Sequence, residues 1–337
     1  MRILLDVMGG DLPSSELVKG GIIAGRRHGL NILFVGDPET IRASLAEHSE
    51  RENDRFSILP ASQAIGMDEP PVQAVRGKRD SSLVKGLIAL EEGKADAFVS
   101  PGNTGAVVVG SIFTLGRIAG ISRPGILASI PTVCGREILV IDVGANVDCA
   151  PKHIVHFALM GASYARDVLG IPDPKIGLLN IGTEKSKGNK LNQRAYEILD
   201  DGPLPFAGNV EGHHLLSERP ADVVVCDGFV GNVFVKALEE GSAVVTGLLK
   251  GLIEKSVRAK LGGLLLRPMF AGLRERISPR HLGGAPLLGV NGVVVIAHGR
   301  SDAEAIEGAI TVASRSVEAN LNEQLARGIS GWDNDGG

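Results

Sequence analysis

Aromatic rings and excess positive charge are both scarce in this sequence. Phe, Trp and Tyr make up 4% of the 337 residues, and 35 Lys and Arg stand against 39 Asp and Glu, giving a formal net charge of -4. A nucleic-acid binder needs a basic face to displace counterions and, for single strands, rings on which bases stack. The composition therefore argues against a nucleic-acid partner.

Cysteine and long apolar runs are sparse as well. Cys134, Cys149 and Cys226 are far apart and form no CxxC pair, which argues against a disulfide framework and a cysteine-based zinc site. No run approaches the roughly 18 apolar residues of a membrane span, and the N-terminus lacks a signal-peptide pattern. We therefore expect a protein of the reducing cytoplasm whose membrane contact, where there is any, is peripheral.

Familiar cofactor and nucleophile motifs are missing. The first strand is not followed by G-x-G-x-x-G, the segment from Gly182 to Asn189 lacks P-loop spacing, and no G-x-S-x-G occurs. Dinucleotide or ATP use is thus unsupported, and we expect no cofactor. Cys149 and Cys226 are conceivable nucleophiles, but cysteine is among the most buried residue types, so a structural role is favoured.

Short apolar runs with glycine close behind recur along the chain, and stretches with helical spacing separate most of them, as in 81–92 and 153–168. The runs are Ile3–Val7, Ile32–Val35, Ala97–Val99, Ile138–Val143, Ile176–Ile181, Val223–Cys226 and Val293–Ala297. This alternation is typical of a largely parallel sheet covered by helices on both faces. We expect one large α/β domain over 1–326, as one body or two lobes around a cleft, and a disordered tail over 327–337.

Glycine beside asparagine follows several of these runs. The pairs lie in Gly102–Ala106, Gly144–Asn146, Gly188–Asn189, Gly208–Gly212 and Gly231–Asn232. Since ligands bind beyond the carboxyl ends of strands in α/β sheets, we expect these loops to converge at one edge. Glycine lets backbone N–H groups approach an anion and asparagine adds an amide donor, so the convergence predicts a phosphate site. Tight turns without a ligand are the alternative for any single loop.

Cationic side chains accompany two of these loops. Arg76 and Lys78 precede a helix expected from Ser81, and Lys185 and Lys187 lie after a predicted strand. Each cation could anchor a phosphate through a charge-assisted hydrogen bond or lie on ordinary solvated surface. The predicted phosphate-binding residues are Gly102, Thr104, Gly105, Asn146, Lys187, Asn189, Arg76 and Lys78.

Carboxylates and a histidine pair also follow predicted strands. Asp142, Glu211 and Asp227 each stand where a carboxylate acts as acid or base or simply holds a loop together. His213 and His214 are adjacent, but no third ligand at recognisable spacing accompanies them, so we expect an exposed loop and no metal.

Residues 243–278 combine apolar residues at helical spacing with scattered Lys and Arg. A basic amphipathic helical pair of this kind can lie on an anionic membrane or receive an acidic protein. The alternative, which is compatible, is a helix pair packed in a dimer interface. The predicted membrane or carrier-protein contacts are Leu261, Leu264, Leu265, Leu266, Arg267 and Phe270.

Along nearly its whole length the chain resembles the bacterial phosphate acyltransferases of phospholipid synthesis, the PlsX family. The resemblance is carried by Asp6–Asp11, Ala74–Arg76, Lys78–Ser82, Gly102–Ala106, Asp142–Asn146, Gly208–Gly212, Asp222–Asn232 and Gly283–Gly292. Val7 and Pro101 stand where the family usually has alanine, and Lys185 stands in a stretch that is usually more acidic, which makes Lys187 the better candidate. The histidine pair falls outside the family pattern.

The resemblance implies a homodimer with a three-layer αβα fold, similar to phosphate acetyltransferases and isocitrate dehydrogenases, with a protruding helical pair. It also implies an acyl-carrier-protein thioester as donor, orthophosphate as acceptor, and delivery of the acyl phosphate to a membrane-bound glycerol-3-phosphate acyltransferase. The protein would then work in the cytoplasm, in peripheral contact with the inner face of the cell membrane.

The expected mechanism is direct attack of phosphate on the thioester carbonyl without a covalent enzyme intermediate. Asn103 and Asn232 are the predicted oxyanion donors, and Asp227 and Glu211 complete the predicted catalytic set. Two other functions are open: a metal- and nicotinamide-dependent dehydrogenase, and a membrane-docked scaffold for acyl carrier protein without catalysis.

Overall fold

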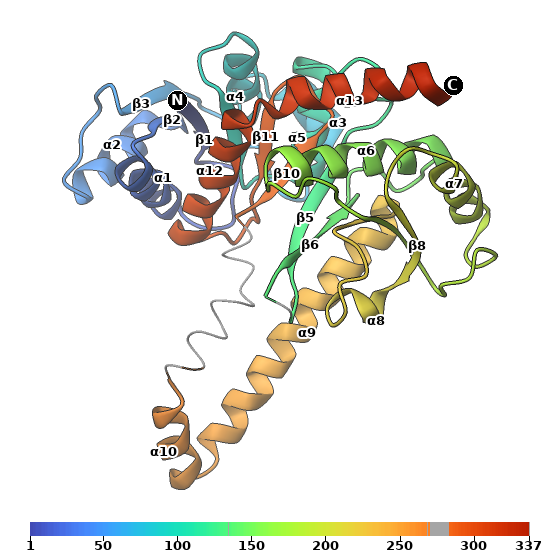
Figure 1. The fold of residues 1–337 in the computed structure, drawn as a ribbon. Helices are drawn as coiled ribbons and strands as arrows, with labels where there is room; N and C mark the ends of the chain where they lie inside the picture. Colours follow the sequence, from blue (N-terminus) through green and yellow to red (C-terminus); the bar gives the residue numbers. More distant parts are fainter. Residues whose placement is uncertain (134, 268, 270–282, 337) are drawn as a thin grey trace.

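The computed structural model describes residues 1–133, 135–267, 269 and 283–336, which fold around an 11-stranded sheet (Figure 1). The order across the sheet is β3-β2-β1-β4-β11-β10-β5-β6-β9-β7-β8. In chain order the strands are β1 (Arg2–Asp6), β2 (Asn31–Gly36), β3 (Phe56–Pro60), β4 (Ala97–Ser100), β5 (Gly125–Pro131), β6 (Glu137–Ile141), β7 (Ile176–Asn180), β8 (Phe206–Glu211), β9 (Val223–Val225), β10 (Ala285–Leu288) and β11 (Val293–Ile296). Each apolar run predicted to be a strand forms one.

The sheet changes direction in its middle. β1 to β4 and β11 are parallel to one another. β10 is antiparallel to both β11 and β5, and β5 is antiparallel to β6. These antiparallel pairings make β6 run opposite to β1 to β4. Since β9, β7 and β8 are parallel to β6, they run opposite to β1 to β4 as well. The carboxyl ends of the two halves therefore lie at opposite edges of the sheet.

Helices cover both faces of each half. They are α1 (Ser14–His28), α2 (Pro38–Glu47), α3 (Pro71–Gly77), α4 (Ser82–Glu91), α5 (Thr104–Thr114), α6 (Pro151–Asp167), α7 (Lys190–Asp200), α8 (Gly212–Leu215), α9 (Gly228–Glu254), α10 (Val257–Leu265), α12 (Ala303–Glu318) and α13 (Leu321–Gly336). In the first half, α1 and α12 share one hydrophobic cluster and α3 to α5 share another. In the second half, α6 and α13 pack on one face, and α8 and the start of α9 pack on the other. The predicted three-layer αβα architecture is confirmed.

Local sequence explains the pairing of α1 with α12. Asp302 caps α12 by accepting the Ala305 N–H at 3.1 Å, and Ile306 and Ile310 are fully buried at helical spacing. A Cβ at Gly20 would lie 2.7 Å from the Ile306 side chain, so glycine on α1 is what allows this approach. Truncating a buried isoleucine to alanine costs about 2–5 kcal/mol, which makes this contact a major stabiliser of the first half.

A long helix leaves the body of the protein, and a second helix packs at its far end (Figure 1). α9 begins at Gly228, well before the predicted amphipathic segment 243–278, because its first turns bury Phe234 against the second half of the sheet. Beyond them the apolar side chains face solvent, as at Leu248, which is 64% exposed. The predicted contact residue Phe270 lies outside the described residues.

The C-terminal segment differs from the predicted disordered tail at 327–337. α13 continues to Gly336, and Ile329 is only 2% exposed in the cluster formed with α6. Leu321, Leu325 and Ile329 recur every four residues and are all buried, so they form one apolar stripe on the helix. The Gly- and Asp-rich composition hides this spacing, which is why the tail prediction was wrong.

Candidate functional site

The carboxyl ends of β1 to β4 and β11 are here called the first edge of the sheet, and the carboxyl ends of β6 to β9 the second edge. Each half of the sheet places its strand-end loops at its own edge. Asn103 follows β4 of the first half, whereas Asn146, Asn209 and Asn232 belong to β6, β8 and α9 of the second half. The prediction that all the Gly-Asn loops meet at one edge of the sheet is therefore wrong. The reversal arises at β10 and β5, which carry no Gly-Asn pair, so nothing in that pattern reveals it.

A buried carboxylate joins the ends of β1 and β4 at the first edge. Asp6 Oδ1 accepts the N–H groups of Met8 at 3.0 Å and Gly9 at 3.2 Å, and its Oδ2 accepts the Ser100 hydroxyl at 2.8 Å. Burial raises the pKa of Asp6, and the hydrogen bonds oppose that rise. A Cβ at Gly9 would lie 2.8 Å from the Gly102 Cα, so glycine at position 9 is what allows the two loops to touch.

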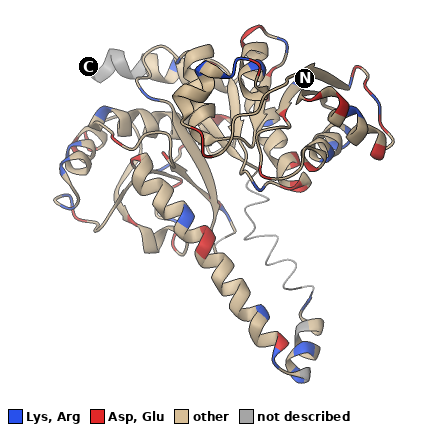
Figure 2. Ribbon diagram, turned by 180° about the vertical axis from the view of Figure 1, so that it is seen from behind, with Lys and Arg blue, Asp and Glu red and all other residues tan. Residues whose placement is uncertain are grey.

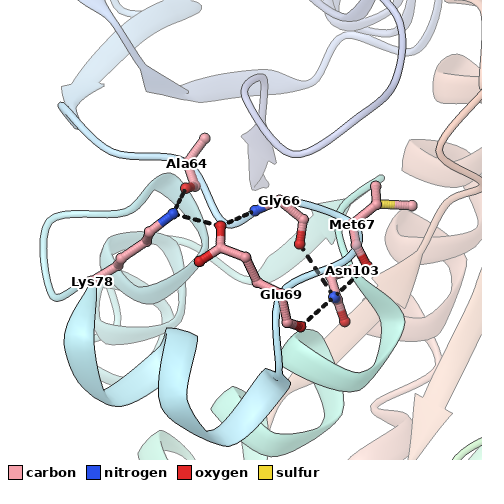
Figure 3. A network of polar contacts seen from close by, with 6 residues as sticks. All are labelled: Ala64, Gly66, Met67, Glu69, Lys78 and Asn103. Carbon is pink, nitrogen blue, oxygen red and sulfur yellow. Dashed lines mark hydrogen bonds and ion pairs between the residues drawn. The ribbon is translucent and has the colours of Figure 1, made fainter.

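Both the amide nitrogen and the amide oxygen of Asn103 form hydrogen bonds within the protein (Figure 3). Its Nδ2 donates to the carbonyl oxygens of Gly66, Met67 and Glu69 at 3.3, 2.8 and 3.1 Å, and its Oδ1 accepts the Ala106 N–H at 3.0 Å as the N-cap of α5. The residue is 8% exposed. The geometry does not support Asn103 as an oxyanion donor, because its amide hydrogens are already donated to carbonyls. It positions a loop instead.

Gly102 and Gly105, on either side of Asn103, also make close contacts within the protein. The Gly102 N–H donates to Ser100 Oγ at 3.1 Å, and a Cβ at Gly105 would lie 2.6 Å from the Pro71 side chain on α3. Thr104, the first residue of α5, is exposed at the N-terminus of the helix. A phosphate-binding role for Gly102, Thr104 and Gly105 stays a prediction, and Thr104 is the member that faces solvent.

Arg76 of α3 and Lys78, its C-cap, differ in whether their N–H groups are free to bind a phosphate. Lys78 Nζ donates to the Ala64 carbonyl at 2.8 Å and pairs with Glu69 at 2.5 Å, so it fastens the same loop that Asn103 holds (Figure 3). The Arg76 guanidinium lies 5.4 Å from the centre of the exposed Phe113 ring. Within the described residues no ion pair of Arg76 is recorded. Of the two predicted phosphate ligands, Arg76 is therefore the one with donors to offer.

Replacing Asn103 by Ala is expected to lower the free energy of unfolding by roughly 2–4 kcal/mol. Loss of an N-cap costs about 0.5–2 kcal/mol, and each buried polar group left unpaired costs about 1–3 kcal/mol. Asn103→Asp keeps a capping oxygen but sets a largely buried carboxylate oxygen against the three carbonyls, so it should also lower the free energy of unfolding. Urea denaturation followed by circular dichroism measures both, and an alanine variant with the midpoint of the unmodified chain would contradict the positioning role.

At the second edge Asp142 organises the loop after β6. Its Oδ1 accepts the N–H groups of Ile126, Gly144 and Ala145 at 2.9–3.1 Å, and its Oδ2 accepts both the backbone N–H and the amide of Asn146. Burial raises the pKa of Asp142, and these hydrogen bonds oppose the rise. The Asp142 side chain is fully buried, and its carboxylate holds the loop in shape.

Asn146 is occupied in the same network. Its Nδ2 donates to the Pro124 carbonyl at 2.7 Å and to Asp142 at 2.8 Å, and its side chain is nearly buried. The predicted role of its amide as a phosphate donor is not supported by this geometry. Its backbone carbonyl instead accepts the Gly228 N–H at 2.8 Å, which attaches the loop to the start of α9.

The N-terminus of α9 lies against this loop. Asp227 caps the 27-residue helix by accepting the Val230 N–H at 2.9 Å, so its carboxylate is a cap. A Cβ at Gly231 would lie 2.0 Å from the Asp142 carbonyl oxygen, so only glycine permits the contact. Asn232 lies beside Gly144, and within the described residues no hydrogen bond of its amide is recorded. Within the described residues, Asn232 and Asn189 are thus the predicted ligands among the asparagines whose side-chain amide nitrogens donate no hydrogen bond.

The loop after β7 lies at the same edge. Asn180 Nδ2 donates to Asn209 Oδ1 at 3.0 Å, and Asn209 Nδ2 donates to the Glu184 carbonyl at 2.8 Å, so both strand-end asparagines hold this loop. Asn189 caps α7 through Asn192. The cap uses only the Asn189 oxygen, so a phosphate contact of its amide nitrogen stays a prediction.

Of the two lysines in that loop, Lys187 is the less occupied. Its Nζ is 3.7 Å from Glu184, and both side chains are well exposed. Lys185 pairs with Asp200 at 2.9 Å and lies over the Tyr196 ring. The structure therefore agrees with the preference for Lys187, whose phosphate contact stays a prediction.

The cysteines near this edge are held as thiols. Burial raises the pKa of Cys149 to about 12, and it raises the pKa of the fully buried Cys226 well above its usual value. The Cys226 thiol donates to the Asp142 carbonyl at 3.5 Å. A thiol with such a pKa is a poor nucleophile, in keeping with the structural role favoured from the sequence.

Glu211 lies beside His213 and His214 as a third side chain of a metal-ligating type, which the sequence interpretation did not find. Ligand atoms of the three residues all lie within 4.8 Å of one another. The sequence Glu-Gly-His-His matches no recognised metal-ligand spacing. The turn from β8 into α8 nevertheless brings the Glu211 carboxylate close to both histidines.

The whole chain is similar to known proteins. Residues 1–324 match the model of the family described as fatty acid synthesis protein. Two relatives named phosphate acyltransferase, from Desulfitobacterium hafniense and Heliobacterium modesticaldum, are 44% and 46% identical over 97% and 98% of this chain and equal shares of their own length.

Solved structures show the fold at lower identity. A phosphotransacetylase from Streptococcus pyogenes has a TM-score of 0.65 at 18% identity, covering 95% of this chain and 94% of its own. A branched-chain phosphotransacylase from Enterococcus faecalis has a TM-score of 0.56 at 15% identity, covering 94% and 99%. The predicted likeness to phosphate acetyltransferases is thereby confirmed for the fold. The resemblance drawn from the motifs is confirmed too, and the chain belongs to the family of fatty acid synthesis proteins that includes the bacterial phosphate acyltransferases.

Proposed function

We propose that this chain transfers an acyl group from an acyl-carrier-protein thioester to orthophosphate, the first step of phospholipid synthesis. The observation that carries the proposal is the identity of 44–46% with phosphate acyltransferases over nearly the whole chain. The likeness to phosphotransacetylases supports only the fold. No cofactor is part of the proposed reaction.

The second edge of the sheet supports the chemistry best. It combines the positive end of α9, the Asn232 amide and the exposed Lys187, and each of these features favours an anion. An oxygen of orthophosphate attacks the thioester carbonyl, the new C–O bond forms, and the C–S bond breaks as the carrier thiolate leaves. The amide of Asn232 stabilises the oxyanion formed in between. Since no enzyme thiol need react, the raised pKa values of Cys149 and Cys226 are consistent with this route.

The protruding pair of α9 and α10 supports peripheral membrane contact. Leu261, Leu264 and Leu265 are 59%, 63% and 82% exposed, and Leu266 and Arg267 next to them are exposed too. Lys and Arg lie around this tip (Figure 2), which suits an anionic bilayer and an amphiphilic product. None of the described helices combines the length and apolarity needed to cross a bilayer. The membrane-bound glycerol-3-phosphate acyltransferase is the proposed recipient of the product, and the same helices could also pair two copies in a homodimer.

The proposed reaction is tested by incubating acyl carrier protein thioester with the chain, with and without orthophosphate, and trapping acyl phosphate with hydroxylamine. We expect hydroxamate only when phosphate and the chain are both present. A carrier-protein scaffold would bind the thioester without phosphate-dependent loss of it, and a dehydrogenase would change the absorbance of a reduced nicotinamide. Either result without hydroxamate would overturn the proposal.

A further inference from the structure

A cluster of metal-ligating side chains lies where β8 turns into α8. Glu211 ends the strand and, with His213 and His214 of α8, places carboxylate oxygen and imidazole nitrogen atoms within 4.8 Å of one another. The His213 and His214 rings lie with their centres 3.8 Å apart and are tilted by 46° to one another. One tightly folded turn thus gathers all three groups without help from another part of the chain.

The surroundings hold this turn in place. Leu215 of α8 is fully buried in the cluster against which Phe234 of α9 packs, whereas His213 is exposed and His214 is half-buried. Glu218 Oε1 lies 3.7 Å from His214 Nε2. A carboxylate beside a ligating histidine is the usual companion of a metal site, because it orients the imidazole ring. The buried Leu215 therefore anchors the turn, and Glu218 is a second acidic group beside the three side chains.

We propose that Glu211, His213 and His214 bind a divalent transition-metal ion of the zinc type. Two imidazole nitrogens and one carboxylate form a common donor set for zinc at sites where a further position stays open to water. The same set disfavours magnesium and calcium, which prefer ligands made up of oxygen alone. The argument for this site uses neither phosphate nor thioester, and it gives Glu211 a role other than the predicted catalytic one.

Zinc titration of the tag-free, chelator-treated full chain, followed by calorimetry, tests the site. We expect one equivalent to bind, and we expect His213→Ala and His214→Ala each to weaken that binding at least about tenfold, since even the loss of a supporting group outside the ligand sphere costs about 10–100-fold. Glu211→Gln should weaken it as well, because it removes a charged ligand. His48→Ala, which removes a histidine in the first half of the sheet, is the matched control and should bind as the unmodified chain does.

Two further readouts make the test decisive. Cobalt(II) bound at the site should give visible absorption bands that zinc displaces and millimolar magnesium does not. Zinc should also raise the melting temperature of the unmodified chain and of His48→Ala, but not that of the His213→Ala/His214→Ala double variant, because only a ligand bound to the folded state stabilises it. The proposal is overturned if the double variant binds zinc as tightly as the unmodified chain, or if magnesium displaces cobalt equally well.

Discussion

Replacing Asn232 by Ala should lower the turnover of acyl carrier protein thioester by about 10²–10³-fold while the fold stays intact. Removal of one preorganised oxyanion donor typically has an effect of this size. Within the described residues no hydrogen bond of the Asn232 amide is recorded, so truncation leaves no buried partner unpaired. The rate of phosphate-dependent hydroxamate formation measures the effect, and circular dichroism checks the fold.

Two neighbouring substitutions separate catalysis from structure. Val233→Ala changes the next residue of α9, whose side chain is 55% exposed, and should leave turnover within a few-fold. Asn146→Ala removes hydrogen bonds to Pro124 and Asp142, so it should lower the melting temperature as well as the rate. Turnover of Asn232→Ala within a few-fold of the unmodified chain would remove Asn232 from the site.

The strands and the αβα layers follow from local signals in the sequence. Continuous apolar runs such as Val223–Val225 are buried on both faces of the sheet, and this burial is what a central parallel strand requires. β5 and β10 follow no such pattern, because they run antiparallel between the two halves. Their pairing is decided by contacts far apart in sequence, and it reverses the second half of the sheet. The Gly-Asn pattern therefore predicted the strand-end loops, but it placed Asn103 at the same edge as Asn146, Asn209 and Asn232, whereas the structure places it at the opposite one.

The roles of the side chains were harder to predict than the elements. Asparagine is common both as a ligand donor and as a cap or loop staple, and the Gly-Asn spacing is the same in both cases. Asn103, Asn146 and Asn209 turn out to bind backbone or side-chain groups of this chain. Which amide remains free depends on the carbonyls that the folded backbone brings near it. Only the three-dimensional structure supplies that information.

The two edges repeat one arrangement. Asp6 at the end of β1 and Asp142 just after β6 are both fully buried, and each accepts the N–H groups of residues two and three positions later in the chain. Each carboxylate thus shapes a glycine-containing loop at the carboxyl end of its own half. The loop at Asp142 differs in adjoining the N-terminus of the 27-residue α9, and this added positive end favours the second edge for phosphate.

The double variant Leu264→Glu/Leu265→Glu should bind anionic vesicles about 100-fold more weakly than the unmodified chain, or weaker still. Burying one leucine contributes about 1.5–3 kcal/mol, so two contribute about 3–6 kcal/mol, and 1.4 kcal/mol corresponds to a factor of ten in affinity. Both side chains are more than half exposed at the tip of the helical pair. Co-sedimentation with vesicles of phosphatidylglycerol and phosphatidylcholine measures the affinity.

The control is Val72→Glu, which places one glutamate on an exposed apolar residue of α3, away from the tip, and should bind vesicles normally. Arg258→Glu/Lys260→Glu keeps the leucines but reverses two charges, so it should weaken binding to anionic vesicles and flatten its salt dependence, because each basic residue near an anionic surface contributes about 1 kcal/mol. If the leucine variant sediments with vesicles like the unmodified chain but no longer forms a dimer in light scattering, the tip pairs two copies and does not enter the bilayer.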